Sequence, residues 1–464
     1  MSAPLVWVVF PMIAGVLFWF YRKKEGLVVL LATIVGLALA VAAFLLPIGQ
    51  TVRVGPWSFE IGTTLTFIGR SLVLENNDRV FLIYIYLICG FWFAGSHAAG
   101  ANRLLIPFGY GIVALLVAAL AVQPFLYAAL LIEVAVLLAV PLLAPPGQPF
   151  SQGVLRFLIF QTLAMPFILL AGWALGAFEA NPSNPVLSSL AVICLGLGFA
   201  FWLAVFPFYT WIPLIAEQAS PYAAGFLFLV MPTADLLLGL NFLDRFGWLR
   251  DSPALFETIR MVGVIMVGTA GIWAIFQKNL NRLFGYAVIV ETGFSLLAIS
   301  LGNQVGAELF ASMFLPRMVG LGLWALSLSI ITRDLRSMSV ADAEGVSARY
   351  PFAAAGVGVA SLALAGLPLL AFFPIRQLLM EELARQSLLT GLVVLAGSVG
   401  MLFGSFRALA VLVRGFVISG SFRETRTQSI LLATGVIGLL AIGLLPQVFL
   451  PLLAALMSAY PQLP

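Results

Sequence analysis

AVFPFYTWIP (204–213) and AGLPLLAFFPIRQ (365–377) each place two prolines six residues apart inside a long apolar stretch. The four prolines are Pro207, Pro213, Pro368 and Pro374. Proline removes a backbone donor and opens the helical hydrogen-bond ladder. At membrane depth, free backbone groups are tolerated only where they are buried in protein or line a wet cavity. Two interrupted helices in corresponding positions of a chain therefore indicate a path through the membrane.

The composition also indicates a membrane protein. Of the 464 residues, 62% are hydrophobic and 9% are charged, and the mean hydropathy is +1.10. A soluble domain carries roughly 25% charged residues. Apolar runs of about 20 residues, each able to cross a hydrocarbon core of about 30 Å, recur along the chain. We predict an all-α integral membrane protein with about 14 spans, near residues 3–21, 26–48, 79–97, 104–122, 124–144, 154–178, 187–209, 221–243, 258–277, 283–301, 306–332, 350–384 (broken), 387–413 and 428–458.

The basic residues indicate an orientation. If both termini lie outside, the inward loops contain 14 Lys and Arg residues and the outward loops contain seven. Inward loops are usually the richer in these residues. We therefore predict that both termini lie outside, in a prokaryotic cytoplasmic membrane or another energy-coupling membrane. The first apolar run lacks a basic region before it and a small-residue cleavage site, so we interpret it as a retained helix.

Landmarks along the chain indicate two related halves. Upstream of each proline pair lies a span with a single internal proline, Pro166 or Pro316. Five spans in each half therefore correspond, and an odd number of spans separates them, which predicts inverted repeats as in many transporters. The predicted divisions are three N-terminal helices with an outer hairpin, a first five-helix repeat, a second five-helix repeat and a C-terminal helix, at residues 1–103, 104–243, 257–415 and 428–464.

Glu133 is the clearest charged residue inside a predicted span. It lies in the middle of FLYAALLIEVAVLLAVPLL (125–143). A charge at mid-membrane costs roughly 2.5–3.5 kcal/mol and normally faces the interior of the helix bundle. Glu133 is therefore a candidate for a proton path or an ion pair, and the alternative is a neutral, hydrogen-bonded packing residue.

Two arginines, Arg317 and Arg376, follow prolines inside predicted spans, the second at the later helix break. Arginine stays charged in proteins, so it cannot release and regain a proton. A fixed cation can still hold a water chain or stabilise a nearby carboxylate. The alternative is a structural ion pair. The glutamates that we consider as partners are Glu133, Glu381 and Glu382.

Two further acidic residues are candidates for the same path. Asp235 lies in LVMPTADLLLG (229–239), and Glu291 lies in YAVIVETGF (286–294). The alternative for both is a side chain that extends to the membrane interface.

The sequence indicates no other chemistry. His97 is the single histidine, and no Cys/His cluster, phosphate-binding glycine loop or nucleophile elbow occurs. We therefore predict no metal, no cofactor, no catalytic residue and no nucleic-acid partner. Cys89 and Cys194 lie in apolar spans, and we interpret them as packing residues.

Together these motifs resemble the antiporter-like membrane subunits of respiratory complex I, related hydrogenases and Mrp-type cation/proton antiporters. The resemblance covers nearly the whole chain and includes FPFYTWIPLIAEQASP (206–221) and QKNLNRLFGYAVIVETG (277–293). It implies 14 core helices with two inverted five-helix repeats, each containing a broken helix.

The resemblance also assigns positions to the charged candidates. Glu133 matches the family's carboxylate in the fifth helix, and Glu291 stands where Gln or His is usual. Arg317 matches a basic residue, commonly Lys, in the eleventh helix. Arg376 stands where the family carries the Lys, or in some members Glu, of the second broken helix.

The chain departs from the family in its first half. The lysine of the first broken helix should fall near Trp202, and the lysine or histidine of the eighth helix should fall near Pro232 or Thr233. No Lys, Arg or His occurs between Arg156 and Arg245. Because a buried Lys can titrate in the working range and Arg cannot, the first half-channel is predicted to lack its relay, with Asp235 as a partial substitute.

We therefore expect a membrane-arm subunit of a complex I-like, redox-driven complex, with reduced or lost proton pumping. The chain would be a non-catalytic subunit of an NADH:quinone oxidoreductase-like translocase, with the redox chemistry in other subunits. Its partners would be other polytopic membrane subunits and the lipid bilayer. One alternative is a stand-alone cation/proton antiporter that uses Glu133, Asp235 and Arg376. Another is a membrane scaffold without transport.

Overall fold

A computed structural model describes residues 2–463, except 55–56, 68, 145–146, 148, 182–183, 336, 415–421, 455–456, 458–459 and 461. The Gly55-Pro56 turn of the predicted outer hairpin lies outside the described residues. The chain divides into two compact units. The first contains residues 1–97, 102–208 and 230–241, and the second contains residues 98–101, 209–229 and 242–464.

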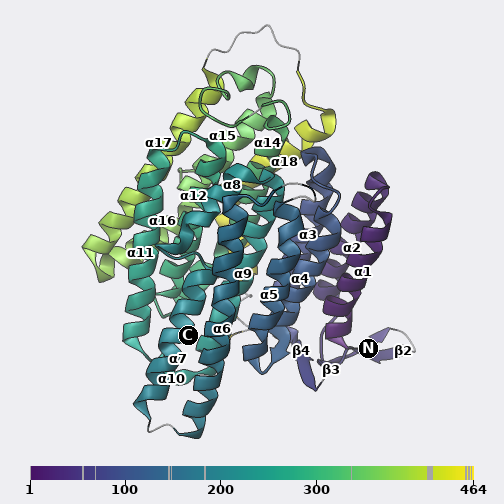
Figure 1. The fold of residues 1–464 in the computed structure, drawn as a ribbon, viewed down its shortest axis with the longest axis vertical. Coiled ribbons are helices and arrows are strands. Elements are labelled where there is room, and N and C mark those ends of the chain that lie inside the picture. Colours follow the sequence, from purple (N-terminus) through teal and green to yellow (C-terminus); the bar gives the residue numbers. More distant parts are fainter. Residues whose placement is uncertain are drawn as a thin grey trace. The chain divides into compact units, whose positions relative to one another are not determined.

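The first unit consists of apolar helices and five short strands (Figure 1). Its helices are η1 (Leu5–Val9), α1 (Phe10–Tyr21), α2 (Glu25–Leu45), η2 (Asn76–Asp78), α3 (Arg79–Ala99), α4 (Leu105–Ala121), η3 (Phe125–Tyr127), α5 (Ala128–Leu143), α6 (Gln152–Ala180) and α7 (Pro185–Trp202). Its strands are β1 (Thr51–Val54), β2 (Trp57–Glu60), β3 (Thr64–Phe67), β4 (Arg70–Val73) and β5 (Val122–Gln123).

The second unit is helical in its described residues. After the short turn η4 (Phe208–Thr210), its helices are α8 (Trp211–Gln218), α10 (Gly247–Arg250), α11 (Pro253–Ile275), α12 (Leu280–Ile299), α13 (Gln304–Ser312), α14 (Phe314–Ile331), η5 (Val346–Ala348), α15 (Pro351–Ala365), α16 (Phe373–Gln386), α17 (Leu388–Val413), α18 (Arg426–Leu444) and α19 (Pro446–Ala454). Helix α9 (Pro221–Arg245) contributes residues to both units.

The strands form two small sheets in the segment for which the sequence predicts an outer hairpin. Strands β1 and β2 pair antiparallel, with Thr51 opposite Glu60. Strands β3, β4 and β5 form the other sheet, with Thr64 opposite Val73 and Leu72 opposite Val122.

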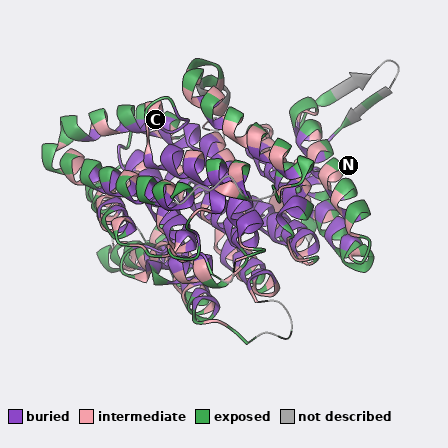
Figure 2. Cartoon of the chain, turned by 90° about the horizontal axis from the view of Figure 1, so that it is seen from above, coloured by how far each residue is buried: buried purple, intermediate pink, exposed green. Residues whose placement is uncertain are grey.

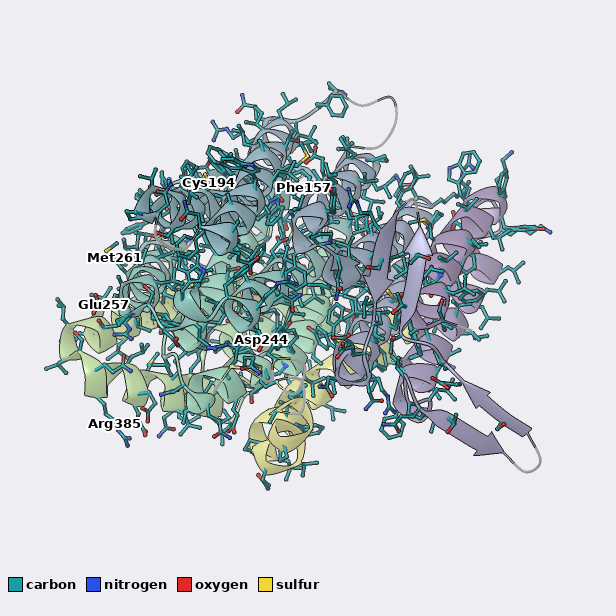
Figure 3. All side chains as sticks on the ribbon, turned by 90° about the horizontal axis from the view of Figure 1, so that it is seen from below. Phe157, Cys194, Asp244, Glu257, Met261 and Arg385 are labelled. Carbon is teal, nitrogen blue, oxygen red and sulfur yellow. The ribbon has the colours of Figure 1, made fainter. Side chains whose placement is uncertain are left out.

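The helices confirm an all-α integral membrane protein. Among the described residues, 11 helices are long and apolar enough to cross a membrane, and three shorter apolar helices span Leu5–Tyr21, Leu105–Ala121 and Pro351–Ala365. The total of about 14 spans and the inverted-repeat relation stay predictions. Figure 2 shows buried residues on the faces between neighbouring helices and exposed residues on their outward faces. Many outward side chains are apolar, for example Met261 on α11, which is 59% exposed (Figure 3).

Small residues and side-chain hydrogen bonds to backbone carbonyls hold neighbouring helices together. In the first unit, the Trp7 indole donates to the Leu39 carbonyl at 3.2 Å, and the Tyr110 hydroxyl donates to the Ala32 carbonyl at 2.6 Å. In the second unit, a Cβ atom at Gly400 of α17 would lie 2.5 Å from the carbonyl oxygen of Gly271 on α11. Close approach at small residues is typical of membrane helices.

The chain leaves helical geometry at both proline pairs. Helix α7 ends at Trp202 and α8 begins at residue 211, while α15 ends at Ala365 and α16 begins at residue 373. The first proline of each pair lies in the non-helical segment. The second, Pro213 or Pro374, lies in the first turn of the following helix, where the missing N–H has no intrahelical acceptor.

The described residues of the loop between α14 and α15 form turns and the 3-10 turn η5. Asp334 accepts hydrogen bonds from the Tyr350 hydroxyl and the Arg423 guanidinium. The Arg423 backbone N–H also donates to the Arg349 carbonyl at 3.1 Å. These bonds tie the loop to the segment that precedes α18.

Candidate functional site

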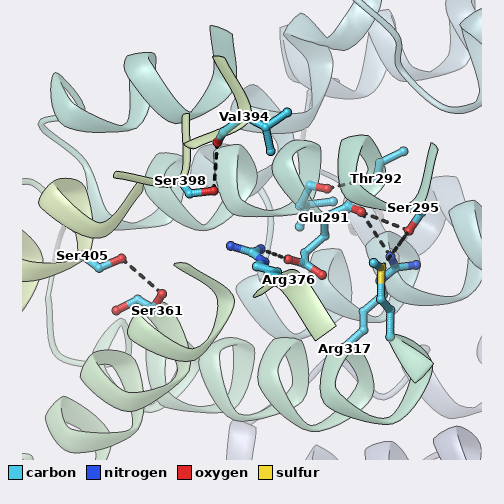
Figure 4. Close-up of polar contacts among 11 residues, drawn as sticks. Glu291, Thr292, Ser295, Arg317, Ser361, Arg376, Val394, Ser398 and Ser405 are labelled. Carbon is cyan, nitrogen blue, oxygen red and sulfur yellow. Dashed lines mark hydrogen bonds and ion pairs between the residues drawn. The ribbon is translucent and has the colours of Figure 1, made fainter. Parts of the chain in front are cut away.

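The buried charged residues of the second unit lie around one turn of α12 (Figure 4). They are Glu291, Arg317 and Arg376. Glu291 in this turn forms an ion pair with Arg376 of α16, in which Arg376 Nη2 donates to Glu291 Oε1. The exposed fractions of the two side chains are 2% for Glu291 and 3% for Arg376. The pair therefore joins α12 to the helix that follows the second break, in an environment without bulk water.

The surroundings of Arg376, in the first turn of α16 beside the break, suit a permanent cation. Gly366, which follows the last residue of α15, has a φ of +83°, and a Cβ atom there would lie 3.0 Å from Arg376 Cδ. The guanidinium carbon of Arg376 lies 4.1 Å from the centroid of the Phe294 ring and 5.4 Å from that of Phe372. The C-terminal end of a helix carries partial negative charge, and aromatic faces attract cations. Both features stabilise the charged guanidinium.

Arg317 of α14 contacts the same turn of α12. Its Nη2 donates to Ser295 Oγ and, at 3.2 Å, to the Glu291 carbonyl oxygen. Ser295 Oγ donates to that carbonyl at 3.0 Å. Two guanidinium groups thus contact this turn. Arg376 binds the Glu291 carboxylate, and Arg317 binds the Glu291 carbonyl oxygen and Ser295.

The cluster also has polar atoms without a hydrogen-bond partner among the described residues. These atoms are Arg376 Nε and Nη1, Arg317 Nε and Glu291 Oε2. Buried groups of this kind require further polar contacts. The turn is therefore both charged and able to bind further polar groups.

The partner of Arg376 differs from the glutamates that the sequence analysis considered. Glu381 accepts a hydrogen bond from Gln377 at 3.2 Å, and Glu382 pairs with Arg385 at 3.1 Å. Glu381 and Glu382 both lie farther along α16 than Arg376, near Arg385 at the end of the helix (Figure 3). Glu291 and Arg376 are 85 residues apart in the sequence. The sequence around each of these residues contains no signal for their contact.

Glu133 of α5 is half-buried in the first unit, and its Oε2 is a buried atom with no hydrogen-bond partner among the described residues. Its Oε1 accepts a hydrogen bond from Thr162 Oγ1 on α6 at 2.8 Å. Glu133 is half-buried and Thr162 is exposed. The same face of α5 also exposes apolar side chains. These are Leu130, Val134 and Leu137.

Asp235 has no exposed surface. Its position inside the chain excludes the alternative of a side chain that extends to the membrane interface. Neither carboxyl oxygen of Asp235 has a hydrogen-bond partner among the described residues. Burial of an unpartnered polar group is costly, so Asp235 stays a candidate for a functional position.

The sequence analysis missed Gln161 of α6. Its Nε2 donates to the carbonyl oxygen of Trp202 at 3.1 Å, and the side chain is buried. Trp202 is the last residue of α7, so Gln161 satisfies a carbonyl that the first helix break leaves free. The signal available in the sequence was an amide side chain within an apolar span.

Comparison with known proteins identifies the family of this chain. Residues 79–404 match a family described as the transmembrane part of NADH:quinone oxidoreductase and Mrp antiporters. The chain belongs to this NADH:quinone oxidoreductase/Mrp antiporter family. One relative in the family, NADH-quinone oxidoreductase subunit 14 from Thermus thermophilus, is 27% identical over 91% of this chain and 93% of its own length. Another, NADH-quinone oxidoreductase subunit N from Sulfurimonas denitrificans, is 27% identical over 48% of this chain and 47% of its own length.

Solved structures show the same fold as this family member. A chain of the Mrp complex from Dietzia superposes with a TM-score of 0.82, at 15% identity, over 99% of this chain and 97% of that chain. A chain of the archaeal membrane-bound sulfane sulfur reductase gives 0.81, at 18% identity, over 100% and 98%. A chain of respiratory complex I from Thermus thermophilus gives 0.77, at 18% identity, over 99% of each.

Proposed function

We propose that this chain is an antiporter-like membrane subunit of a redox-driven, proton-translocating complex, packed beside other polytopic membrane subunits. The full-length similarity to subunit 14 of the Thermus thermophilus NADH-quinone oxidoreductase supports this function. The fold shared with chains of complex I, the sulfane sulfur reductase and the Mrp complex is consistent with it. The redox chemistry belongs to other subunits.

The buried pair of Glu291 and Arg376 carries the second part of the proposal, which is that proton translocation through this chain is reduced or lost. A relay needs groups that exchange protons in turn. At the second helix break the chain instead holds a guanidinium, which does not deprotonate in proteins, in an ion pair with a carboxylate.

The first half of the chain supports the same conclusion. It carries Trp202 where the family's lysine is expected, and no Lys, Arg or His occurs in residues 157–244. The two acidic candidates of this half, Glu133 and Asp235, lie in different settings, because Glu133 is half-buried and Asp235 is fully buried. We assign this chain a structural or coupling role, with Glu133 directed at a neighbouring subunit.

The membrane placement follows from the charges of the loops. The chain is an integral protein of a prokaryotic cytoplasmic membrane or another energy-coupling membrane. Its greater number of Lys and Arg residues in the predicted inward loops favours both termini outside. The four predicted divisions, with two five-helix repeats at residues 104–243 and 257–415, complete the proposal.

Purification and transport measurements test the function. An affinity-tagged chain should co-purify from its native membrane with iron–sulfur or quinone-linked subunits. Transport of cations or protons by the isolated chain in vesicles would instead support a stand-alone antiporter.

The state of the proton path is tested in the assembled complex. We expect Glu133→Gln and Asp235→Asn complexes to translocate as many protons per electron as the wild type. A lower ratio in either variant, with electron transfer intact, would show that this chain conducts protons.

A further inference from the structure

The turn between α1 and α2 combines two kinds of exposed side chain. The sequence WFYRKK (19–24) places three aromatic residues before three basic residues. Helix α1 ends at Tyr21, and α2 begins at Glu25. The whole motif therefore occupies the last turn of one helix and the short connection to the next.

The aromatic residues lie where they can contact the interface of a bilayer. The exposed fractions of Trp19, Phe20 and Tyr21 are 39%, 66% and 55%. Trp and Tyr concentrate at the level of lipid headgroups because each combines an apolar ring with a polar group. The aromatic residues therefore predict that the turn lies at the depth of the headgroup phosphates.

The basic residues are ordered unequally. Arg22 Nη1 donates to the Trp19 carbonyl oxygen at 2.9 Å, and its guanidinium carbon lies 4.2 Å from the Trp19 ring centroid. Arg22 is thus fixed against the end of α1. Lys23 and Lys24 are exposed and extend the positive charge beyond the aromatic residues.

The nearest acidic side chain does not neutralise this charge. Glu25 follows Lys24 directly, but it forms an ion pair with Arg103. Among the described residues, Arg103 forms an ion pair with Glu25, whereas Arg22, Lys23 and Lys24 form none, so three positive charges are left without a carboxylate. A partner of complementary chemistry is an anion with more than one acceptor oxygen, such as a phosphodiester.

The adjoining helices provide apolar surface on the membrane side of this charge. Helix α1 exposes Val16 and Leu17, and α2 exposes Leu27, Leu30 and Leu31. Helices α1 and α2 are joined by the basic turn and lie side by side (Figure 1). A ligand with a phosphate at the turn and apolar chains along these helices fits both surfaces.

We propose that the α1–α2 turn is a binding site for an acidic phospholipid. The phosphodiester is held by Lys23 and Lys24, with Arg22 as the fixed donor next to Trp19, and the acyl chains lie along α1 and α2. The site goes beyond the proposed function and does not depend on it, because a purified chain can be tested without electron transfer or proton translocation.

Lipid retention by the purified full-length chain tests the proposal. The chain is reconstituted in nanodiscs that contain phosphatidylcholine with a minor fraction of phosphatidylglycerol, and the bound lipids are measured by native mass spectrometry. Each basic residue near an anionic bilayer surface strengthens binding by about fivefold. We expect the Lys23→Gln/Lys24→Gln variant to bind phosphatidylglycerol at least tenfold more weakly than the wild type.

A matched control removes two exposed cations elsewhere. The Lys278→Gln/Arg385→Gln variant loses the same charge and should retain phosphatidylglycerol like the wild type, with an unchanged melting temperature in all three proteins. Equal loss of phosphatidylglycerol in both variants would show that the lipid is attracted by the overall positive charge of the protein, and would overturn the proposed site at the α1–α2 turn. Equal binding of phosphatidylcholine and phosphatidylglycerol, or loss of the lipid when partner subunits assemble on this face, would also overturn it.

Discussion

Ala204 and Gly366 hold the same position at the ends of two broken helices. Both have left-handed backbone angles, with φ of +51° and +83°. After each, the next N–H bonds to the carbonyl five residues earlier, from Val205 to Ala200 at 2.9 Å and from Leu367 to Leu362 at 3.0 Å. This is the Schellman pattern of helix termination, so α7 and α15 end by the same local geometry.

Gly366→Ala should destabilise the protein by about 1–2 kcal/mol from backbone strain alone, because L-residues are disfavoured in left-handed geometry. The added Cβ would also lie 3.0 Å from Arg376 Cδ and press on the buried ion pair. The reciprocal change, Ala204→Gly, removes strain and should leave stability equal or slightly higher. Thermal unfolding of both variants in the same detergent measures the difference. A Gly366→Ala protein as stable as the wild type would contradict the assigned geometry.

Removing either partner of the Glu291–Arg376 pair should cost about 3–5 kcal/mol, because it leaves an uncompensated buried charge or its unpaired hydrogen-bonding groups. We expect Arg376→Met and Glu291→Met to melt well below the wild type. The double variant should be more stable than the sum of the single changes predicts, since it removes both charges.

The exposed pair of Arg385 and Glu382 on the same helix is the control for this cycle. Its Arg385 side chain is 73% exposed, and exposed pairs contribute about 0–1 kcal/mol. Additive effects at Glu291 and Arg376, like those expected for the control pair, would show that the buried groups are not coupled.

The sequence predicts a helical membrane protein because apolar runs of about 20 residues can be identified without any knowledge of tertiary contacts. It also predicts both helix breaks, although the helices end before the prolines. Helix α7 ends at Trp202 and α15 at Ala365, because a left-handed residue closes each helix before the proline is reached. The second proline of each pair lies in the first turn of the next helix, so it does not interrupt the hydrogen bonds of a helix.

The site is harder to predict for two physical reasons. The contact between Glu291 and Arg376 depends on tertiary packing of segments 85 residues apart, which no local pattern encodes. The half-buried position of Glu133 depends on the rotation of α5 about its axis. A span that is apolar on all sides carries no periodicity from which that rotation can be derived.

The different settings of Glu133 and Asp235 predict different reactivity toward a hydrophobic carbodiimide. This reagent adds to a protonated carboxyl group to form an O-acylisourea, which rearranges to a stable N-acylurea. The Glu133 side chain is half-buried, and Asp235 has no exposed surface. In the isolated chain, we expect peptide mass spectrometry to find the adduct on Glu133 and not on Asp235.

Assembly provides the control for this labelling. If a neighbouring subunit covers the face of α5, Glu133 should be protected in the intact complex and labelled in the isolated chain. Glu133→Gln should abolish the adduct in both. Equal labelling of Glu133 before and after assembly would place this face against lipid and remove its proposed role toward a partner.

The link between Asp334 and Arg423 should respond to acid but not to pH changes near neutrality. The hydrogen bonds from Tyr350 and Arg423 hold the pKa of Asp334 below its ordinary value, which is about 3.9 in unfolded chains. A carboxyl group with a lowered pKa stabilises the folded state above the unfolded pKa. That contribution is lost as the pH falls through the lowered value. The attachment of the loop should therefore be constant from about pH 5 to 8 and weaken below about pH 4.

Hydrogen–deuterium exchange of residues 346–353 and 422–426 measures this attachment. Asp334→Asn should raise exchange in both segments at neutral pH, because the amide cannot replace the charged acceptor of Arg423. Asp342→Asn is the matched control, since the pKa of Asp342 is lowered by hydrogen bonds from Ser337 and Ser339 within the same loop. It should leave residues 422–426 unchanged. Equal effects of the two variants at residues 422–426 would mean that a general loss of loop charge, and not the Asp334–Arg423 contact, holds this segment to α15.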